Sequence, residues 1–150
     1  MKIPSNTFVV LRIVLGSLLL ISGGEKLSTP YQNFLYVIQH YQMLPPLLEE
    51  WSARIFPWIE FSTGLFVVLG LWLTITLRAQ MGLFFLFILV LSQALIRQLS
   101  VDECGCFGEL ISFPVPVVLI MDSIFFILTA CLIKNLSQTS RFSLDHVFPK

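Results

Sequence analysis

Residues 79–96 have the sequence AQMGLFFLFILVLSQALI, in which the amides of Gln80 and Gln93 are the main polar exceptions. An uncharged apolar run of this length can cross the hydrocarbon core of a bilayer as a helix. Across the chain, 56% of the residues are hydrophobic and 12% are charged, about half of the roughly 25% charged residues of a soluble domain. We therefore predict a transmembrane helix here and an integral membrane protein overall.

Three further apolar runs occur along the chain, and we predict spans at about 7–23, 55–73, 79–96 and 115–133. Between the first two, apolar and aromatic residues recur at helical spacing, which predicts a short amphipathic helix that lies on the membrane surface or caps the bundle: Tyr31, Phe34, Leu35, Ile38 and Tyr41. No soluble domain is evident. The sequence therefore predicts an all-α integral membrane protein, one domain over residues 1–150, with four transmembrane helices in a bundle.

The stretch Cys104-Gly105-Cys106-Phe107-Gly108 follows the third span and holds two of the three cysteines. Two thiols one residue apart can close a disulfide only if the peptide between them bends, and Gly105 permits that bend. Such a small ring is strained, and strained disulfides are the exchangeable ones. The stretch therefore predicts a redox-active dithiol, with Arg97 as the nearest cation to support a thiolate; the alternative is a tight loop with two unrelated cysteines.

The distribution of Lys and Arg predicts the orientation in the membrane. If the N-terminus is cytoplasmic, the cytoplasmic side holds Lys2, Arg78, Lys134, Arg141 and Lys150, and the other side holds Lys26, Arg54 and Arg97. The excess of positive charge then lies inside, as the positive-inside rule requires. We therefore expect both termini in the cytoplasm. In a bacterial inner membrane the Cys-Gly-Cys loop would face the periplasm, where disulfides persist.

Three ionisable residues fall inside the predicted spans: Arg12, Glu60 and Asp122. Arg12 also argues against a cleaved signal peptide, whose apolar region is uncharged. A charge at the centre of a transmembrane helix is costly, so these side chains should face the bundle interior and find partners. We predict an intramembrane charge layer in which Arg12 compensates the two carboxylates. It either fixes the helix register or handles protons beneath the cysteines.

Several of these features together resemble a known family. They are an arginine in the first helix, Ser22-Gly23-x-x-Lys26, the Phe34, Tyr41, Leu44-Pro45 series, Pro57-x-x-Glu60-x-x-x-Gly64, the Cys-Gly-Cys-Phe-Gly block and an aspartate in the last span. The chain resembles the MauE branch of the DoxX-like, redox-associated four-helix membrane proteins. MauE is implicated in maturing the periplasmic, disulfide-rich subunit of methylamine dehydrogenase. The resemblance implies a periplasm-facing redox accessory role and leaves the client open.

Three functions remain as hypotheses. The first is a membrane thiol–disulfide oxidoreductase in which Cys104 and Cys106 exchange with a periplasmic thioredoxin-like protein or a client. The second is a non-catalytic scaffold for assembly or maturation, whose cysteines only tighten a loop. The third is a small transporter or metal-delivery component that uses Glu60 and Asp122. Replacing both cysteines by serine separates the first two.

Cofactors and partners are less well specified. A membrane quinone is the candidate electron acceptor, although no sequence feature demands one. A Cys-x-Cys pair offers two ligands where a closed zinc site needs four. His40 and His146 fall on opposite sides of the membrane in this topology, so we predict no metal site. The formal net charge of zero gives no argument for nucleic acid.

Overall fold

The computed structural model describes residues 5–98 and 114–140; the Cys104–Cys106 stretch and His146 lie outside these residues. The described residues form helices and no strands, which confirms the predicted all-α class. The helices are α1 (Ser5–Ser28), α2 (Tyr31–Tyr41), α3 (Pro46–Leu69), α4 (Leu73–Ile96), α5 (Val115–Lys134) and α6 (Leu136–Thr139).

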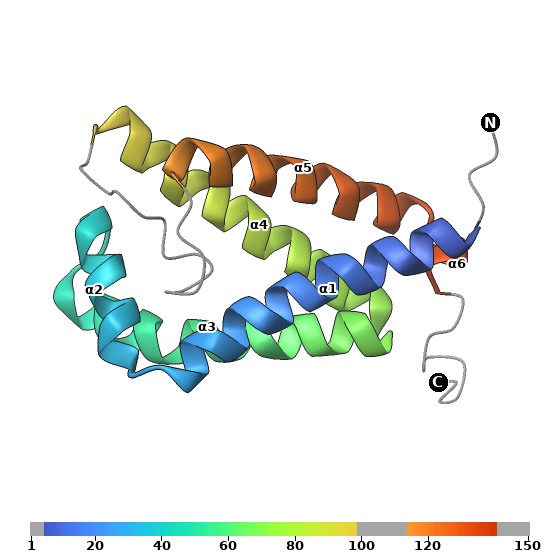
Figure 1. The fold of residues 1–150 in the computed structure, drawn as a ribbon, viewed down its shortest axis with the longest axis horizontal. Coiled ribbons are helices and arrows are strands. Elements are labelled where there is room, and N and C mark those ends of the chain that lie inside the picture. Colours follow the sequence, from blue (N-terminus) through green and yellow to red (C-terminus); the bar gives the residue numbers. More distant parts are fainter. Residues whose placement is uncertain (1–4, 99–113, 141–150) are drawn as a thin grey trace.

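The four long helices α1, α3, α4 and α5 are each long and apolar enough to cross a membrane. They run along the long axis of the molecule (Figure 1). Large apolar side chains on them are exposed, such as Ile75, Ile120 and Ile127, as expected of surfaces that face lipid tails. The prediction of a multi-pass membrane protein with four spans is confirmed.

The two ends of the bundle differ (Figure 1). At one end, here called the α2 end, lie α2, the C-terminal end of α4 and the N-terminal end of α5. At the other, the α6 end, lie the N-terminal end of α1, the turn between α3 and α4, and α6. The described residues that flank the Cys104–Cys106 stretch, Gln98 and Pro114, belong to the α2 end.

Helices α3 and α4 do not have the predicted boundaries of 55–73 and 79–96. Helix α3 begins at Pro46, where a proline at the first helical position leaves no N–H unsatisfied, and continues through Pro57. It ends because Gly70 takes a left-handed conformation with φ 71°, which glycine adopts without steric cost. Trp72 is also left-handed, and α4 starts at Leu73.

Helix α1 extends past the predicted end at residue 23, because its glycines pack directly against α3. A Cβ on Gly23 would lie 2.5 Å from the backbone nitrogen of Phe61, and one on Gly64 would lie 2.5 Å from that of Leu20. Small residues at such contacts let transmembrane backbones approach closely. The tertiary contact therefore outweighs the low helix propensity of Gly23 and Gly24.

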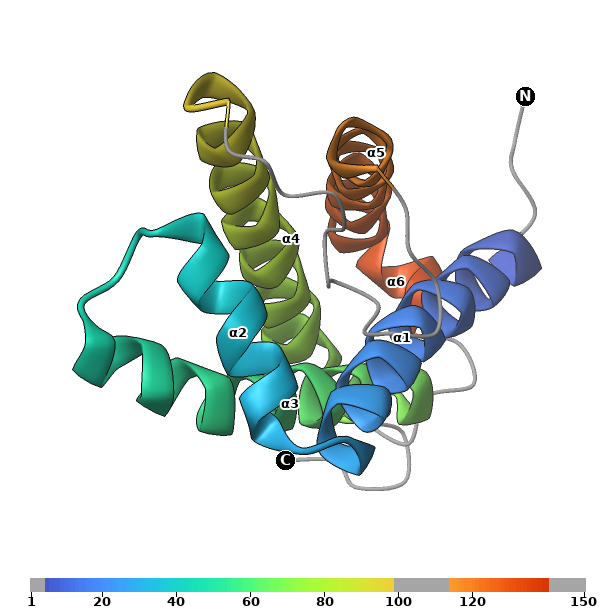
Figure 2. The same cartoon turned by 60° about the vertical axis from the view of Figure 1, so that its left-hand side comes forward.

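Helix α2 confirms the predicted short amphipathic helix between the first two spans. Pro30 precedes it as the N-cap residue, while the hydroxyl of Ser28 donates to the carbonyl of Gly24 at 2.8 Å and so completes α1. Helix α2 packs mainly against α3, in front of which it lies in Figure 2. It crosses the end of the bundle rather than running along it (Figure 1). Its last residue, Tyr41, is buried in an apolar cluster with Leu91 and Val118.

Helices α4 and α5 form the second close pair of the bundle. Phe84 and Phe125 stack at a centroid distance of 5.6 Å across their interface. Phe84 is buried and Phe85 is half exposed, so neighbouring phenylalanines of the apolar run face the core and the lipid in turn.

Candidate functional site

The centre of the candidate site is an ion pair between α1 and α3. The Nζ atom of Lys26 lies 2.8 Å from Oε2 and 3.2 Å from Oε1 of Glu60. Both side chains are almost inaccessible, with 2% and 0% of their surface exposed. Lys26 also donates to the Ser22 hydroxyl at 2.9 Å. The ammonium and the carboxylate thus neutralise each other where water is excluded.

Two glycine-containing motifs, one on α1 and one on α3, bring the two charges of this pair together. Ser22 and Lys26 are four residues apart, so they lie on the same face of α1. Gly23 places that face against the backbone of α3 near Pro57 and Phe61. Glu60 points from α3 into the same contact, so the Ser-Gly-x-x-Lys and Pro-x-x-Glu motifs form one structural unit.

A second carboxylate, Asp122 of α5, lies close enough for the charges of Glu60 and Lys26 to act on it. Asp122 is 3% exposed, and its Oδ2 atom has no hydrogen-bond partner among residues 5–98 and 114–140. The phenol of Tyr41 lies nearby on α2. Burial raises the pKa of Tyr41 to about 12, and the charge of Asp122 adds to this increase.

Arg12, which the sequence prediction grouped with Glu60 and Asp122, lies away from this cluster. Its Nη1 atom donates to the carbonyl oxygen of Thr139 at 3.0 Å and so ties α1 to α6. Lys26 stands further along α1 by about 21 Å, at about 1.5 Å per residue. Glu60 is therefore paired with Lys26, and Arg12 acts at the opposite end of the bundle.

Arg97 is exposed at the C-terminal end of α4. Its Nη1 atom donates to the carbonyl oxygen of Gln42 at 3.2 Å, which joins α4 to the end of α2. The other predicted residues of the redox stretch, Cys104, Gly105, Cys106, Phe107 and Gly108, lie outside the described residues. Their proximity to Arg97 therefore stays a prediction.

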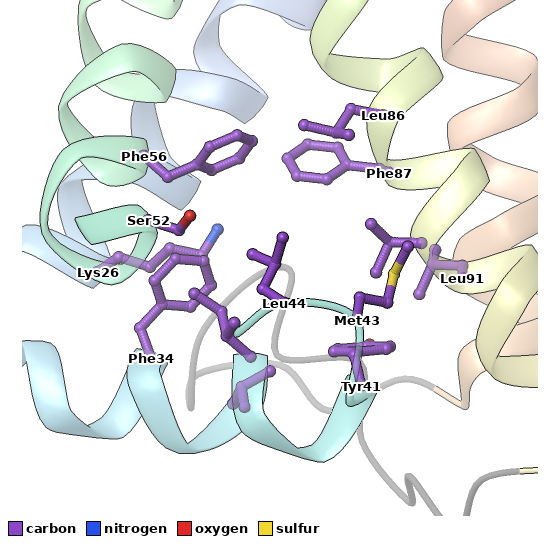
Figure 3. Close-up of a pocket in the computed structure, with 13 residues that line it drawn as sticks. Lys26, Phe34, Tyr41, Met43, Leu44, Ser52, Phe56, Leu86, Phe87 and Leu91 are labelled. Atoms are coloured by element: carbon purple, nitrogen blue, oxygen red, sulfur yellow. The ribbon is translucent and has the colours of Figure 1, made fainter. Parts of the chain in front are cut away.

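A cavity of about 200 Å³ opens beside the ion pair, between α2, α3 and α4 (Figure 3). Its walls are almost entirely apolar and include the rings of Phe34, Phe56 and Phe87. Lys26 reaches the wall with its Nζ atom 5.2 Å from the centre of the Phe34 ring, a distance at which a cation is attracted to an aromatic face. The cavity therefore combines aromatic surfaces with one wall formed by Lys26 of the buried ion pair.

The remaining sequence candidates contribute less to this site. Cys131 is a free, partly buried thiol near the C-terminal end of α5. The His40 ring bonds to the carbonyl of Tyr36 on its own helix at 2.8 Å. Within the described part of the chain, no three His, Cys, Asp or Glu residues lie close enough together to hold a metal ion.

Comparison with known proteins identifies the family. A family model described as methylamine utilisation protein MauE matches residues 4–134. The chain belongs to the MauE family. The matched range takes in all four long helices, both motifs of the ion pair and the Cys104–Cys106 stretch. No curated protein and no solved structure matches the chain.

Lys26 is the main functional candidate that sequence reasoning missed, because it was counted as a cation outside the spans. The signal was its position four residues after Ser22, which places both side chains on the same face of one helix. Glu60 needed a cation at its own depth in the membrane, and depth along α1 favours Lys26 over Arg12.

Proposed function

We propose that this MauE-family protein is a membrane-embedded thiol–disulfide accessory protein. Cys104 and Cys106 form its exchanging pair and support the maturation or disulfide handling of periplasmic proteins. The single observation that carries the proposal is the match to the MauE family over residues 4–134, which includes this closely spaced cysteine pair. The substrate is a thiol or disulfide of a periplasmic client or of a thioredoxin-like protein.

The proposed exchange balances as a two-electron reaction. A client thiolate attacks one sulfur of the Cys104–Cys106 disulfide, forming a mixed disulfide and releasing the other sulfur as a thiolate. A second client thiolate then closes the client disulfide and releases the first cysteine. Two electrons and two protons pass from the client to Cys104 and Cys106, and the reverse sequence reduces a client.

The orientation of the bundle is part of the proposal. Both termini would lie in the cytoplasm of a bacterial cell and the α2 end would face the periplasm, in keeping with the excess of Lys and Arg on the cytoplasmic side. Gln98 and Pro114 then present the cysteine stretch on the oxidising side of the membrane. The cluster of Lys26, Glu60 and Asp122 lies toward the same end and would accept or supply protons during exchange.

A scaffold without redox activity is the second candidate function. The observation that favours it is the completeness of the Lys26–Glu60 pair: each charge has a partner, and a purely structural role explains both. In that case the bundle and α2 would hold a client, and the cysteines would only tighten the connection between α4 and α5.

The reduction potential of the cysteine pair tests the proposal. The purified protein, in a Cys131→Ser background, is equilibrated with glutathione buffers, and the thiols are counted by alkylation and mass shift. Closing a strained ring makes it easier to reduce, so we expect a potential between about −250 and −120 mV, the range of exchange catalysts. A potential near about −320 mV, or thiols that never pair, would favour the scaffold.

A trapping experiment identifies the partner. In the same background, Cys106→Ser leaves Cys104 without a resolving thiol, so a mixed disulfide with the client should accumulate in cells and separate on reduction. The matched control is Cys104→Ser/Cys106→Ser, which retains the bundle and should trap nothing. Loss of maturation in this double variant supports exchange, whereas retained maturation supports the scaffold.

A further inference from the structure

We propose that the cavity between α2, α3 and α4 binds the ring of a membrane quinone. This inference rests on the proposed function, for which it names the electron acceptor. Oxidation of the Cys104 and Cys106 thiols to a disulfide releases two electrons and two protons. One quinone takes up both and becomes a quinol, so the exchange is balanced without a further reactant.

The size and the walls of the cavity favour a ring. An apolar cavity of about 150 Å³ stays dry and accepts a benzene-sized molecule, so about 200 Å³ has room for a six-membered ring with small substituents. The rings of Phe56 and Phe87 lie 5.8 Å apart at an angle of 66° and form part of the lining. Aromatic faces and edges of this kind pack well against another ring.

The cavity has a mouth through which a lipophilic molecule can enter. Met43, Leu44 and Leu86 all contribute to its lining, and they are 46%, 39% and 40% exposed. These side chains belong to the α2–α3 connection and to the membrane-spanning helix α4. A quinone can therefore place its ring inside while its tail stays in the lipid.

Polar groups on one wall provide the means to recognise a ring oxygen. Ser52 lines the cavity, and its hydroxyl points toward the ammonium of Lys26 (Figure 3). None of the hydrogen bonds among the described residues uses the Ser52 hydroxyl, so it can donate to a quinone carbonyl.

The occupant that competes with a quinone is a lipid acyl chain, which also suits an apolar cavity. An acyl chain accepts no hydrogen bond from the Ser52 hydroxyl, whereas a quinone oxygen does. The hydroxyl donor at the wall therefore favours the quinone.

The test measures binding of a dimethoxy-methyl-benzoquinone with a decyl tail to the protein in nanodiscs, relative to empty nanodiscs of the same lipid. We expect a saturable excess of about one quinone per chain. Val90→Trp fills the cavity and should weaken binding at least tenfold. Val14→Trp places the same bulk on an exposed position of α1 and should leave binding unchanged.

A second pair of variants keeps the test decisive if Val90→Trp does not fold. Ser52→Ala should weaken binding several-fold. Ser123→Ala removes a hydroxyl that donates to the carbonyl of Leu119 at 2.7 Å on its own helix and should have no effect. No excess of quinone, equal effects of the paired variants, or displacement by decyl alcohol at the concentration of the quinone would overturn the inference.

The cysteine variant separates this inference from the proposed function. Cys104→Ser/Cys106→Ser should bind the quinone as the wild type does, because the variant leaves the described lining residues unchanged. If the protein binds no quinone but the reduction potential of the cysteine pair lies in the range of exchange catalysts, the quinone inference alone is overturned. Intact binding together with unreactive cysteines would overturn the thiol exchange alone.

Discussion

The Nζ atom of Lys26 lies 2.8 Å from Oε2 of Glu60, and neither side chain is accessible to solvent. The two residues come from α1 and α3, whose backbones touch at Gly23 and Gly64. Burying an ion costs several kcal/mol, and this cost is offset only by an oppositely charged partner at good geometry together with further hydrogen bonds. Lys26 meets both conditions: Glu60 accepts two of its hydrogen bonds, and Ser22 accepts the third at 2.9 Å.

Removing one member of the Lys26–Glu60 pair should strongly destabilise the bundle. Lys26→Met leaves a buried carboxylate without its counter-charge, and Glu60→Gln leaves a buried ammonium; breaking such a pair typically costs about 3–5 kcal/mol. The double variant Lys26→Met/Glu60→Gln buries no charge at this point and should recover most of the loss. Unfolding of the four proteins in detergent gives the coupling as a double-mutant cycle.

The exposed pair of Arg54 and Glu50 is the matched control for this cycle. These residues also approach to 2.6 Å, but both side chains are about half exposed. Water and salt screen such a pair, so Glu50→Gln should leave the unfolding midpoint within error of the wild type. If Glu50→Gln and Glu60→Gln lowered the stability equally, the buried pair would have no special structural importance. The same would follow if the stability losses of the two single variants in the cycle simply added.

Gly23→Ala should separate α1 from α3 and destabilise the protein. The new Cβ would lie 2.5 Å from the backbone nitrogen of Phe61, and backbone atoms inside a helix contact cannot move aside as a flexible side chain can. Gly82→Ala is the control, because nothing lies within 4 Å of a Cβ there. It should be neutral or stabilising by up to about 1 kcal/mol, since alanine is the better helix former. A lower midpoint for Gly82→Ala than for Gly23→Ala would refute this packing.

Gln80→Met should stabilise the bundle. Gln80 is fully buried, and neither its Oε1 nor its Nε2 atom has a hydrogen-bond partner among residues 5–98 and 114–140. An unsatisfied buried polar group costs about 1–3 kcal/mol, and methionine has a similar shape without that cost. Gln39→Met, at an exposed position of α2, should change the midpoint little. Destabilisation by Gln80→Met alone would mean that the amide is satisfied, for instance by buried water.

The Tyr41 phenol should titrate near pH 12, above its ordinary pKa of about 10. Its protonated form is the one that the fold favours, so its contribution to stability is complete below pH 10. That contribution is lost as the pH rises from about 10 to 12, because the unfolded chain releases the proton first. Tyr41→Phe should therefore flatten the fall of the unfolding midpoint over this window. Asp122→Asn removes one cause of the shift and should lower the Tyr41 pKa in an ultraviolet absorbance titration.

Long apolar runs predicted most of the fold, because four apolar segments of spanning length allow few other structures in a membrane. The helix ends were harder to predict. The predicted spans left residues 74–78 between the second and third helices, but the turn is made by Gly70 and Trp72, both with left-handed backbones. Left-handed glycines and interior glycines look alike in a sequence, and only the packing of Gly64 against α1 distinguishes them.

The partner of Glu60 could not be predicted from charge alone. Sequence reasoning recognised that Glu60 needs a cation and selected Arg12, because Lys26 lay beyond the predicted end of the first span at residue 23. In the structure, contact with α3 keeps α1 helical to Ser28 and brings Lys26 to the depth of Glu60. The choice between the two cations depends on helix register, which is a tertiary property.

The three cysteines provide a test of membrane orientation, because Cys131 lies toward the α6 end and the stretch with Cys104 and Cys106 joins two helices at the α2 end. With the α2 end in the periplasm, a membrane-impermeant maleimide should label the Cys131→Ser variant in intact spheroplasts once the pair is reduced. Cys104→Ser/Cys106→Ser retains only Cys131 and should stay unlabelled until the cells are lysed and the membrane is dissolved. The opposite pattern would invert the topology and place the cysteine pair in the reducing cytoplasm, where a stable disulfide does not persist. Labelling of both variants in intact cells would indicate leaky membranes, so a cytoplasmic marker thiol is measured in the same samples and must remain unlabelled.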